Sequence, residues 1–369
     1  MAVIMLVGLG GYGENYVKEC LKESFTHKVA AVADPFANNS PFIEQIKAKG
    51  IPVFSSPQEA FDNVKGIELT VISSPIHTHF EYVKCALENH SNVLCEKPVV
   101  LSQEKLAQLE DCSKKSGCFV AVGYQLCYAK DLQILRNDVI NGIFGKPVRM
   151  KSLRMMRRGD IYYGRNGWAG RLECKGEPVY DSPVSNACAH QIQNMLFLLG
   201  DSNRETCRVT SVEGHLMKAR EDIENYDAAS LKINTDVGVP LYYYTAHCCP
   251  SKKIGPMSVY EFEKATIFND NDDFWAIFKD GSTKDYRGLE KGDRLQKLYD
   301  AIDCCSSHSK PSCTLEGCYG HTQVVLEAQK LDIEIRKDKT RCTNGEDSWF
   351  EIPNIEKDYL NAYEAWEIS

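Results

Sequence analysis

Three glycines near the N-terminus have the spacing of a phosphate-binding turn. Gly8, Gly10 and Gly13 follow the short apolar run Ala2–Val7. In such a turn the first glycine allows a tight bend, the second lets backbone N–H groups approach phosphate oxygens, and the third lets the next helix pack on the strand. The N-terminus of that helix adds partial positive charge. The residues of this predicted pyrophosphate site for a dinucleotide are Gly8, Gly10, Gly11, Tyr12 and Gly13.

An acidic residue lies where a dinucleotide-binding unit usually has one. Asp34 ends the second apolar run, about 20 positions after Gly13. A carboxylate at this point accepts hydrogen bonds from the ribose hydroxyls of NAD and repels the 2′-phosphate of NADP. The loop over residues 35–39 contains no Arg or Lys that would attract such a phosphate. Asp34 therefore predicts NAD as the cofactor.

Two further polar segments follow apolar runs that have the character of strands. One contains Ser74, Pro75 and His79, and the other contains Glu96 and Lys97. Open α/β sheets bind ligands at the carboxyl ends of their strands, so we predict that these five residues contact the cofactor. A lysine beside a nicotinamide ring in a partly dry cleft has a lowered pKa and suits proton transfer. On the residues alone, Lys97 is equally well explained as a loop lysine before a proline.

The pattern around these motifs predicts a parallel sheet in the first third of the chain. Short apolar runs alternate with amphipathic helical stretches, which is typical of a sheet covered by helices on both faces. Ser102 is a suitable N-cap for one of the helices, and Gly117 is a suitable stop. The predicted strands are Val3–Val7, Val29–Ala33, Glu68–Ile72, Asn92–Cys95 and Cys118–Val122, and the helices include Phe80–Asn89 and Ser102–Lys115.

The rest of the chain predicts an α+β domain with a large, mostly antiparallel sheet. Ser230–Asn234 alternates polar and apolar residues with a period of two, and Phe274–Lys279 runs into the hairpin signal Asp280-Gly281. We expect helices over 129–143, 184–199, 293–304 and 314–330, and an irregular polar tail over 338–369.

The predicted fold class is therefore α/β plus α+β, in two domains. Residues 1–123 form an NAD-binding Rossmann domain, and residues 124–369 form a domain for substrate binding and oligomerisation. A chain of 369 residues, 43% of them hydrophobic, is long enough for two cores.

Charge and hydropathy limit the partners of the chain. A formal net charge of -8, with no run of five basic residues, argues against binding to nucleic acid or to an anionic membrane. The run Ala2–Val7 is too short to span a bilayer, and no basic segment precedes it. We therefore expect a cytoplasmic protein.

The 16 cysteines are scattered along a long chain, so we expect free thiols in a reducing compartment instead of a disulfide framework. One cluster near the C-terminus lacks the Cys-x-x-Cys spacing of structural zinc sites, and we predict no metal there. Its members are Cys304, Cys305, His308, Cys313, Cys318 and His321.

These motifs together resemble those of the Gfo/Idh/MocA oxidoreductase family. The resemblance rests on the glycine-rich turn, the Pro75 to His79 spacing, the Glu96-Lys97-Pro98 tripeptide and the change to an antiparallel second domain. It extends to about residue 335 and is strongest through residue 100. It implies an NAD-dependent dehydrogenase that oxidises a secondary hydroxyl of a sugar, inositol or glycoside, with C3 of a hexose as one plausible position.

The resemblance also implies roles for individual residues and an assembly. Lys97 would contact the cofactor and the substrate hydroxyl, often before a cis Pro98. The catalytic histidine would be His190, on the first helix of the second domain. Family members commonly pair through the open face of the antiparallel sheet, which implies a homo-oligomer, a dimer or a tetramer.

The sequence departs from the family pattern four residues before His190, where the family typically has an aspartate and this chain has Asn186. Residues four apart share a helix face, so we expect both side chains to point into one cleft. An asparagine can hydrogen-bond a hydroxyl but cannot act as a base. Whether Lys97 or His190 is the base stays open, and Asp181 is either a compensating acid or a helix cap.

The segment from Tyr162 to Arg171 is the best candidate for holding a sugar. It offers aromatic faces for CH groups and planar donors for hydroxyls, although a surface loop packed on the sheet or on another subunit explains it as well. His247, after a predicted strand, is a further candidate. The predicted substrate-binding residues are Tyr163, Arg165, Asn166, Trp168, Asp181, Asn186 and His190.

Two other classes of function are consistent with the same motifs. The first is a glycosidase that retains NAD and oxidises its sugar only transiently, so that NADH absorbance shows no net change with turnover. The second is an NAD-binding regulator without catalysis. The presence of both Lys97 and His190 argues against a regulator, and the acidic charge argues against direct contact with DNA.

Overall fold

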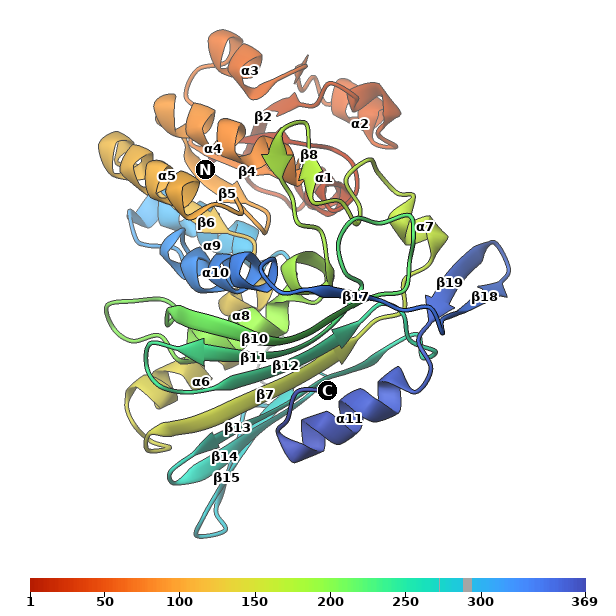
Figure 1. Ribbon diagram of the computed structural model, residues 1–369. Coiled ribbons are helices and arrows are strands. Elements are labelled where there is room, and N and C mark those ends of the chain that lie inside the picture. The colour runs from red at the N-terminus through yellow and green to blue at the C-terminus, as the bar shows by residue number, and fades with distance from the viewer. Residues whose placement is uncertain (272, 288–293) are drawn as a thin grey trace. The chain divides into compact units, whose positions relative to one another are not determined.

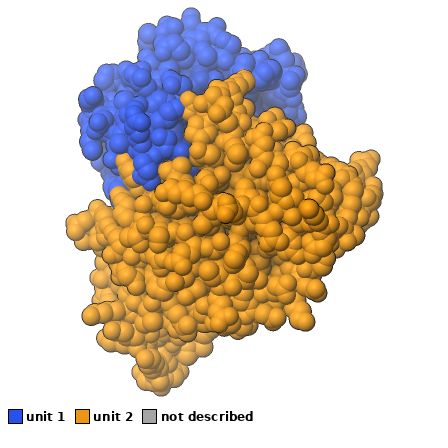
Figure 2. All heavy atoms as spheres, viewed as in Figure 1, with its two compact units in different colours: residues 1–129, 292–318 blue, residues 130–291, 319–369 orange. Residues whose placement is uncertain are grey.

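The computed structural model describes residues 1–271, 273–287 and 294–369 (Figure 1). The chain forms two compact units, coloured separately in Figure 2: residues 1–129 with 292–318, and residues 130–291 with 319–369. This division differs from the two continuous domains expected from the sequence. Residues 292–318 join the first unit because α9 (Gln296–Ser307) places Leu298, Ala301 and Ile302 in its hydrophobic core.

The first unit is built on a six-stranded parallel sheet with the order β3-β2-β1-β4-β5-β6. Its central strands are buried apolar runs, as a sheet covered on both faces requires. The strands are β1 Val3–Val7, β2 Lys28–Ala33, β3 Val53–Phe54, β4 Leu69–Ile72, β5 Asn92–Cys95 and β6 Val120–Val122. The predicted Rossmann sheet is confirmed, with the short β3 added at its edge.

The first-unit helix between Ser102 and Gly117 begins and ends at the signals predicted for it. The Ser102 side chain accepts a hydrogen bond from the backbone of Lys105, and Gly117 ends the same helix with φ 71°. The helices, besides α9, are α1 Gly13–Cys20, α2 Ile43–Ala48, α3 Pro57–Asn63, α4 His79–Glu88 and α5 Gln103–Ser116. Short 3-10 turns cover Ala37–Asn39, Ile76–Thr78, Gln125–Tyr128 and Glu316–Cys318.

The second unit contains a nine-stranded sheet with the order β16-β15-β14-β13-β7-β12-β11-β10-β17. Its neighbouring strands are antiparallel except for the pairs β7 with β12 and β10 with β17. The predicted antiparallel sheet is thus confirmed. The strands are β7 Pro147–Met155, β10 Val209–Lys218, β11 Ala228–Thr235, β12 Leu241–Ala246, β13 Ile254–Phe262, β14 Ala265–Asp270, β15 Asp273–Phe278, β16 Thr283–Asp285 and β17 Ile333–Ile335.

Helices and small hairpins complete the second unit. The helix α8 packs against β7 and α10, and α11 packs against β7 and β12. The helices are α6 Lys130–Ile140, α7 Asp160–Tyr163, α8 Ala189–Leu198, α10 Tyr319–Ala328 and α11 Ile355–Ala365, with a π-helical turn over Pro183–Ala187. The hairpins pair β8 Glu173–Cys174 with β9 Glu177–Pro178, and β18 Thr340–Asn344 with β19 Asp347–Glu351.

The prediction of an irregular tail over 338–369 is wrong, since these residues form β18, β19 and α11. Gly345, with φ 62°, allows the tight turn of the hairpin. Helix α11 buries Ile355, Tyr359 and Tyr363 in one hydrophobic cluster with Tyr244 of β12. Its polar composition hides this apolar stripe, because only one side of the helix faces the sheet.

The cysteines all lie in the described part of the chain, and all 16 are free thiols. Among the described residues, no group of three or more His, Cys, Asp or Glu side chains is placed to hold a metal ion. No helix within residues 1–271, 273–287 and 294–369 has both the length and the apolar character needed to cross a bilayer.

Candidate active site

The glycine-rich turn has the backbone of a ligand cradle. Gly8 has φ 85°, and a Cβ atom there would lie 2.6 Å from the backbone nitrogen of Ser74. A Cβ atom on Gly13 would collide with the carbonyl oxygen of Gly8. By contrast, Cβ atoms on Gly10 and Gly11 would meet no described atom within 4 Å. Gly8 and Gly13 thus allow the close packing of the turn, while Gly10 and Gly11 border open space that fits a pyrophosphate.

Asp34 holds this turn from the end of β2. Its Oδ2 accepts a hydrogen bond from the backbone N–H of Leu9 at 2.7 Å, and its Oδ1 accepts one from Phe36 at 2.7 Å. A carboxylate has about four acceptor positions, so both oxygens keep capacity for a ligand hydroxyl. The residue therefore fixes the glycine turn and still fits the ribose of a dinucleotide.

The loops after β4 and β5 are joined by His79. The His79 side chain is buried, and its Nδ1 and Nε2 lie 2.8 Å from the carbonyl oxygens of Pro98 and Ser74, respectively. The Lys97–Pro98 peptide bond is cis, as the resemblance implied. Pro75 is exposed on the same loop as Ser74. His79, predicted to contact the cofactor, thus connects the two segments that carry the other predicted contacts.

The carboxylate of Glu96 is bonded within the protein. Its Oε1 accepts hydrogen bonds from the hydroxyl of Tyr16 at 2.6 Å and from Nζ of Lys297 on α9. The Lys297 side chain is 1% exposed, and burial lowers its pKa. Its ammonium also faces the ring of Tyr12, with Nζ 4.4 Å from the ring centre. Sequence reasoning missed Lys297, although a lysine among the apolar residues of a helix is an available signal.

Asp181 is the centre of the predicted substrate residues in the second unit. It is buried, and its Oδ2 accepts a hydrogen bond from the backbone N–H of Gly170 at 2.8 Å. Its Oδ1 accepts one from the side-chain amide of Asn186 at 2.8 Å, and Nη2 of Arg165 lies 3.6 Å from Oδ2. Asp181 is not the helix cap, since that role belongs to Ser182.

The helix expected over 184–199 is interrupted between Asn186 and His190. A π-helical turn covers Pro183–Ala187, Cys188 has φ -117° and ψ 18°, and α8 begins at Ala189. The two side chains are therefore not four residues apart on one continuous α-helix, and the expectation of a shared face does not follow from spacing. The amide of Asn186 is instead directed to Asp181.

A buried histidine and two tyrosines lie near the carboxylate of Asp181. Nδ1 of His247 is 2.8 Å from the hydroxyl of Tyr163, and the Tyr162 ring packs edge-on to the His247 ring at 5.4 Å. Burial is the main cause that lowers the pKa of His247 well below its usual value, and the nearby Arg158 and Arg165 lower it further. His247 is therefore a neutral imidazole at physiological pH.

The other predicted residues of this segment have local roles. Oδ1 of Asn166 accepts hydrogen bonds from the backbone of Trp168 and Ala169 and so shapes the loop. The guanidinium of Arg165 stacks on Tyr162 at 3.6 Å and lies 5.0 Å from the Trp168 ring centre. The aromatic rings and planar donors of this segment thus contact one another, and its role as a sugar site stays a prediction.

The N-terminal part of the chain matches the model of a known protein family. Residues 3–124 match the Gfo/Idh/MocA family model, described as an oxidoreductase family with an NAD-binding Rossmann fold. This stretch, about a third of the chain, is therefore similar to the Gfo/Idh/MocA oxidoreductases. The resemblance seen in the sequence is confirmed, and the Gfo/Idh/MocA description confirms NAD as the cofactor.

Two of the curated relatives of this chain are named dehydrogenases. Inositol 2-dehydrogenase of Klebsiella pneumoniae is 23% identical over 201 residues, which are 54% of this chain and 55% of the relative. D-glucoside 3-dehydrogenase of Escherichia coli is 29% identical over 148 residues, 40% of each chain. The chain therefore spans about half the length of the curated relatives it matches, or less.

Solved structures share the fold over most of the chain. UDP-N-acetylglucosamine 3-dehydrogenase GnnA from Acidithiobacillus ferrooxidans is 16% identical with a TM-score of 0.70, and covers 89% of this chain and 97% of its own. The WlbA dehydrogenase from Bordetella pertussis, in complex with NADH and UDP-GlcNAcA, is 16% identical with a TM-score of 0.72, covering 89% and 94%. Both units thus have a known fold, beyond the stretch matched by the Gfo/Idh/MocA model.

The ion pair between Lys297 and Glu96 gives a first prediction for the stability of the first unit. Lys297→Met leaves the Glu96 carboxylate partly buried without its cation, and we expect a loss of about 3 kcal/mol in unfolding free energy. The double variant E96Q/K297M should lose less, because it removes both charges. Urea unfolding of the four proteins measures the coupling, and simple additivity of the two substitutions would contradict the pairing.

A second prediction concerns Asp227, whose carboxylate accepts hydrogen bonds from the backbone of Ala219 at 2.9 Å and of Arg220 at 3.2 Å. Burial raises the pKa of Asp227 to about 6 from its ordinary 3.8. Its contribution to stability is therefore complete below about pH 4 and is lost as the pH rises through about 6, at a cost of roughly 3 kcal/mol.

The test is D227N, which cannot ionise. We expect the unfolding free energy of D227N, relative to the unchanged protein, to rise between pH 4.5 and pH 7 in urea titrations. Asp280→Asn, at an exposed turn, is the control and should show no such rise. A difference between D227N and the unchanged protein that stays constant with pH would refute the prediction.

Proposed function

We propose that this protein is an NAD-dependent dehydrogenase that oxidises a secondary hydroxyl of a sugar, inositol or glycoside. The observation that carries the proposal is the glycine turn with open space at Gly10 and Gly11, within a domain of an NAD-binding oxidoreductase family. The names of the relatives, inositol 2-dehydrogenase and D-glucoside 3-dehydrogenase, support a polyhydroxylated substrate and make C3 of a hexose one position to test.

The residues of the first unit would hold the cofactor. Backbone N–H groups at Gly10 and Gly11 would bind the pyrophosphate, and Asp34 would accept hydrogen bonds from the ribose hydroxyls. Bound NAD supplies the acceptor for the hydride that leaves the substrate carbon. Lys97 lies at the carboxyl end of β5, where it would contact the nicotinamide end and the substrate hydroxyl.

The residues of the second unit would orient the sugar. Asp181 fixes the orientation of the Asn186 amide, whose carbonyl oxygen can accept and whose second N–H can donate a hydrogen bond. Tyr163 and His247 form a second buried polar pair beside it. His190 on α8, or Lys97, would take the proton of the reacting hydroxyl, and the same group would return it in the reduction.

A screen of sugars, inositols and glycosides with NAD tests the proposal. We expect at least one of them to raise NADH absorbance with repeated turnover. Substrate cleavage without net NADH would instead indicate a glycosidase that retains its cofactor. NAD binding with no turnover of any compound would indicate a regulator, and either result would overturn the dehydrogenase proposal.

The choice of NAD over NADP has its own test. Asp34→Ala removes the acceptor for the ribose hydroxyls and the charge that repels a 2′-phosphate, so NAD affinity should fall much more than NADP affinity. Asp62→Ala, an exposed acid of the same unit, is the control. Titration of each protein with both cofactors measures the effect, and equal losses of affinity for NAD and NADP would refute the predicted preference for NAD.

We further propose that the protein acts in the cytoplasm and forms a homo-oligomer, a dimer or a tetramer. The free thiols support a reducing compartment. The half-exposed aromatic pair Phe268 and Trp275, whose rings stack at 5.6 Å on β14 and β15, supports an interface on the sheet. Light scattering at several protein concentrations gives the state, and a monomer throughout would refute it.

A further inference from the structure

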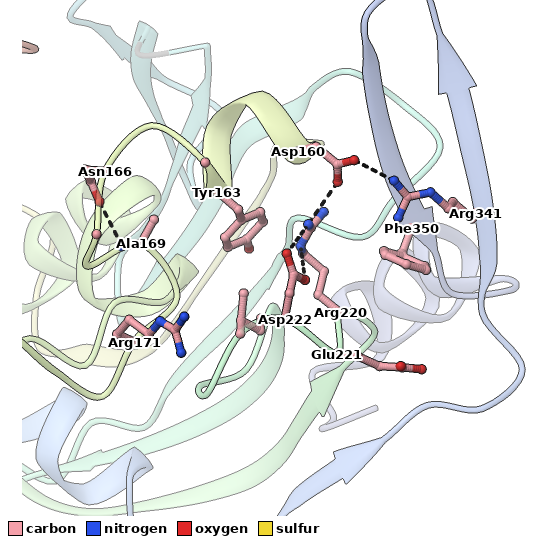
Figure 3. Close-up of a pocket in the computed structure, with 13 residues that line it drawn as sticks. Asp160, Tyr163, Asn166, Ala169, Arg171, Arg220, Glu221, Asp222, Arg341 and Phe350 are labelled. Atoms are coloured by element: carbon pink, nitrogen blue, oxygen red, sulfur yellow. Dashed lines mark hydrogen bonds and ion pairs between the residues drawn. The ribbon is translucent and has the colours of Figure 1, made fainter.

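A cavity of about 590 Å³ opens in the second unit, beside the predicted sugar segment. Figure 3 shows that Asp160 and Tyr163 come from α7, Arg220 and Asp222 from the loop after β10, and Arg341 and Phe350 from the β18–β19 hairpin. The volume falls within the range of small-molecule sites, about 300–1,000 Å³. Part of the lining, including Tyr163 and Asn166, belongs to the segment predicted to hold a sugar, whereas no motif of the sequence pointed to Arg220, Asp222 or Arg341.

One wall of the cavity is a ladder of alternating charges. Arg220 binds Asp222 through two parallel contacts, Nε to Oδ1 at 3.0 Å and Nη2 to Oδ2 at 2.6 Å. The same Nη2 lies 2.9 Å from Oδ1 of Asp160, whose Oδ2 accepts a hydrogen bond from Arg341 at 2.6 Å. The order along the wall is therefore Asp222, Arg220, Asp160 and Arg341. Arg220 is 4% exposed, so the centre of the ladder is fixed in place.

The charges of the lining cancel. Besides the ladder, the lining contains one more arginine, Arg171, and one more acid, Glu221, which makes three of each sign. Arg171 is itself paired with Glu224 at 2.8 Å, and Glu221 with Lys339 at 2.8 Å. A site for phosphate or carboxylate needs uncompensated positive charge, and this cavity has none to spare. It instead presents rows of fixed donors and acceptors, which suit neutral hydroxyl groups.

Apolar surface completes the cavity. Tyr163, Ala169 and Ile223 pack together in its lining, and Figure 3 shows the ring of Phe350 on the other side of Arg220 from Tyr163. A sugar ring offers CH groups to such surfaces and hydroxyls to the ladder at the same time. A fully charged ligand would match only the ladder, and a purely apolar ligand would match only the apolar surface.

Tyr163 connects the cavity to the candidate active site. Its ring lines the cavity, while its hydroxyl lies 2.8 Å from Nδ1 of His247. Asp160, three residues earlier on α7, belongs to the ladder. A ligand in the cavity is thus one side chain away from the residues that would orient the reacting sugar.

We propose that this cavity binds the second sugar unit of an uncharged glycoside whose first unit is oxidised. The inference rests on the proposed function and names its substrate class: a neutral disaccharide or larger glycoside, in preference to a free monosaccharide or a sugar phosphate.

The experiment compares glucose, glucose 6-phosphate and a panel of neutral disaccharides, namely cellobiose, maltose, trehalose and sucrose. We expect kcat/KM with NAD for the best disaccharide to exceed that for glucose by at least tenfold, and glucose 6-phosphate to be no better than glucose. Equal values for glucose and every disaccharide would overturn the inference, as would preference for the phosphate.

The matched variant is Arg341→Ala, which removes the exposed end of the ladder. Arg341 has a side chain that is 51% exposed, so the fold should persist, and unfolding curves verify this. The variant should raise KM for the preferred disaccharide about tenfold and leave kcat and the values for glucose unchanged. Equal effects on glucose and the disaccharide would contradict the assignment.

Binding separates failure of this inference from failure of the dehydrogenase proposal. If no sugar reduces NAD, the proposed function fails, and saturation-transfer NMR with the same disaccharides still tests the cavity. Binding to the unchanged protein that weakens in R341A supports the subsite. Absence of binding by every disaccharide overturns it.

Discussion

Lys97→Met and His190→Asn, made separately, should each lower kcat by about a hundred- to ten-thousand-fold with the best substrate of the screen. Each variant removes one of the two groups that could take the hydroxyl proton. His190→Asn should leave NAD affinity unchanged, since the glycine turn and Asp34 lie in the first unit. Steady-state NADH formation across pH, with a separate NAD titration, measures both quantities.

The pH profiles of these variants decide which group is the base. The variant that lacks the base should lose the pH-dependent limb of kcat, while the other should keep it at a lower rate. Lys115→Met and His90→Asn are matched controls, because both side chains are exposed. Full turnover in either test variant would remove that residue from the proton path.

Gly10→Ala should weaken NAD binding on the order of a hundred-fold without disturbing the fold. The added methyl meets no described atom within 4 Å, so the turn can accept it. It would, however, occupy the space through which the pyrophosphate approaches the backbone. Calorimetric titration with NAD and a thermal unfolding curve, with a Tm change of about 1 °C or less, are the two measurements.

Gly13→Ala is the contrasting variant. Its methyl group would collide with the carbonyl oxygen of Gly8 and come within 2.7 Å of Oγ of Ser73, so the turn must shift. We expect the Tm of this protein to fall by several degrees, because overpacking costs about 1–3 kcal/mol. Unchanged NAD affinity in Gly10→Ala would show that the pyrophosphate does not lie over Gly10.

The parts of the fold that the sequence predicts well are those with local causes. The glycine turn, the cap at Ser102 and the stop at Gly117 each depend on residues within a few positions. The buried parallel strands can also be predicted from the sequence, because burial on both faces leaves an uninterrupted apolar run. Such signals need no knowledge of distant partners.

The parts that sequence reasoning missed depend on partners far away along the chain. Lys297 meets Glu96 across a sequence separation of 201 residues, and Tyr359 of α11 meets Tyr244 of β12. The interruption at Cys188 has no proline or glycine to mark it. Asp181 was predicted as part of the site, but its bond to Gly170 could not be foreseen, since it closes a loop whose shape only packing determines.

Helix α11 has a consequence for self-association. On the sheet face that carries Tyr244, α11 covers β7 and β12. Near the C-terminal end of the helix, Nζ of Lys151 donates a hydrogen bond to the carbonyl oxygen of Tyr363 at 2.6 Å. Ile277 of β15, 42% exposed, lies beyond that covered area. A second subunit that docks flat on this face would therefore meet a helix first and bare strands only at the β14–β15 side. In the homo-oligomer that we propose, α11 would then keep a partner subunit away from β7 and β12, and the contact would fall on the half-exposed side chains of β14 and β15.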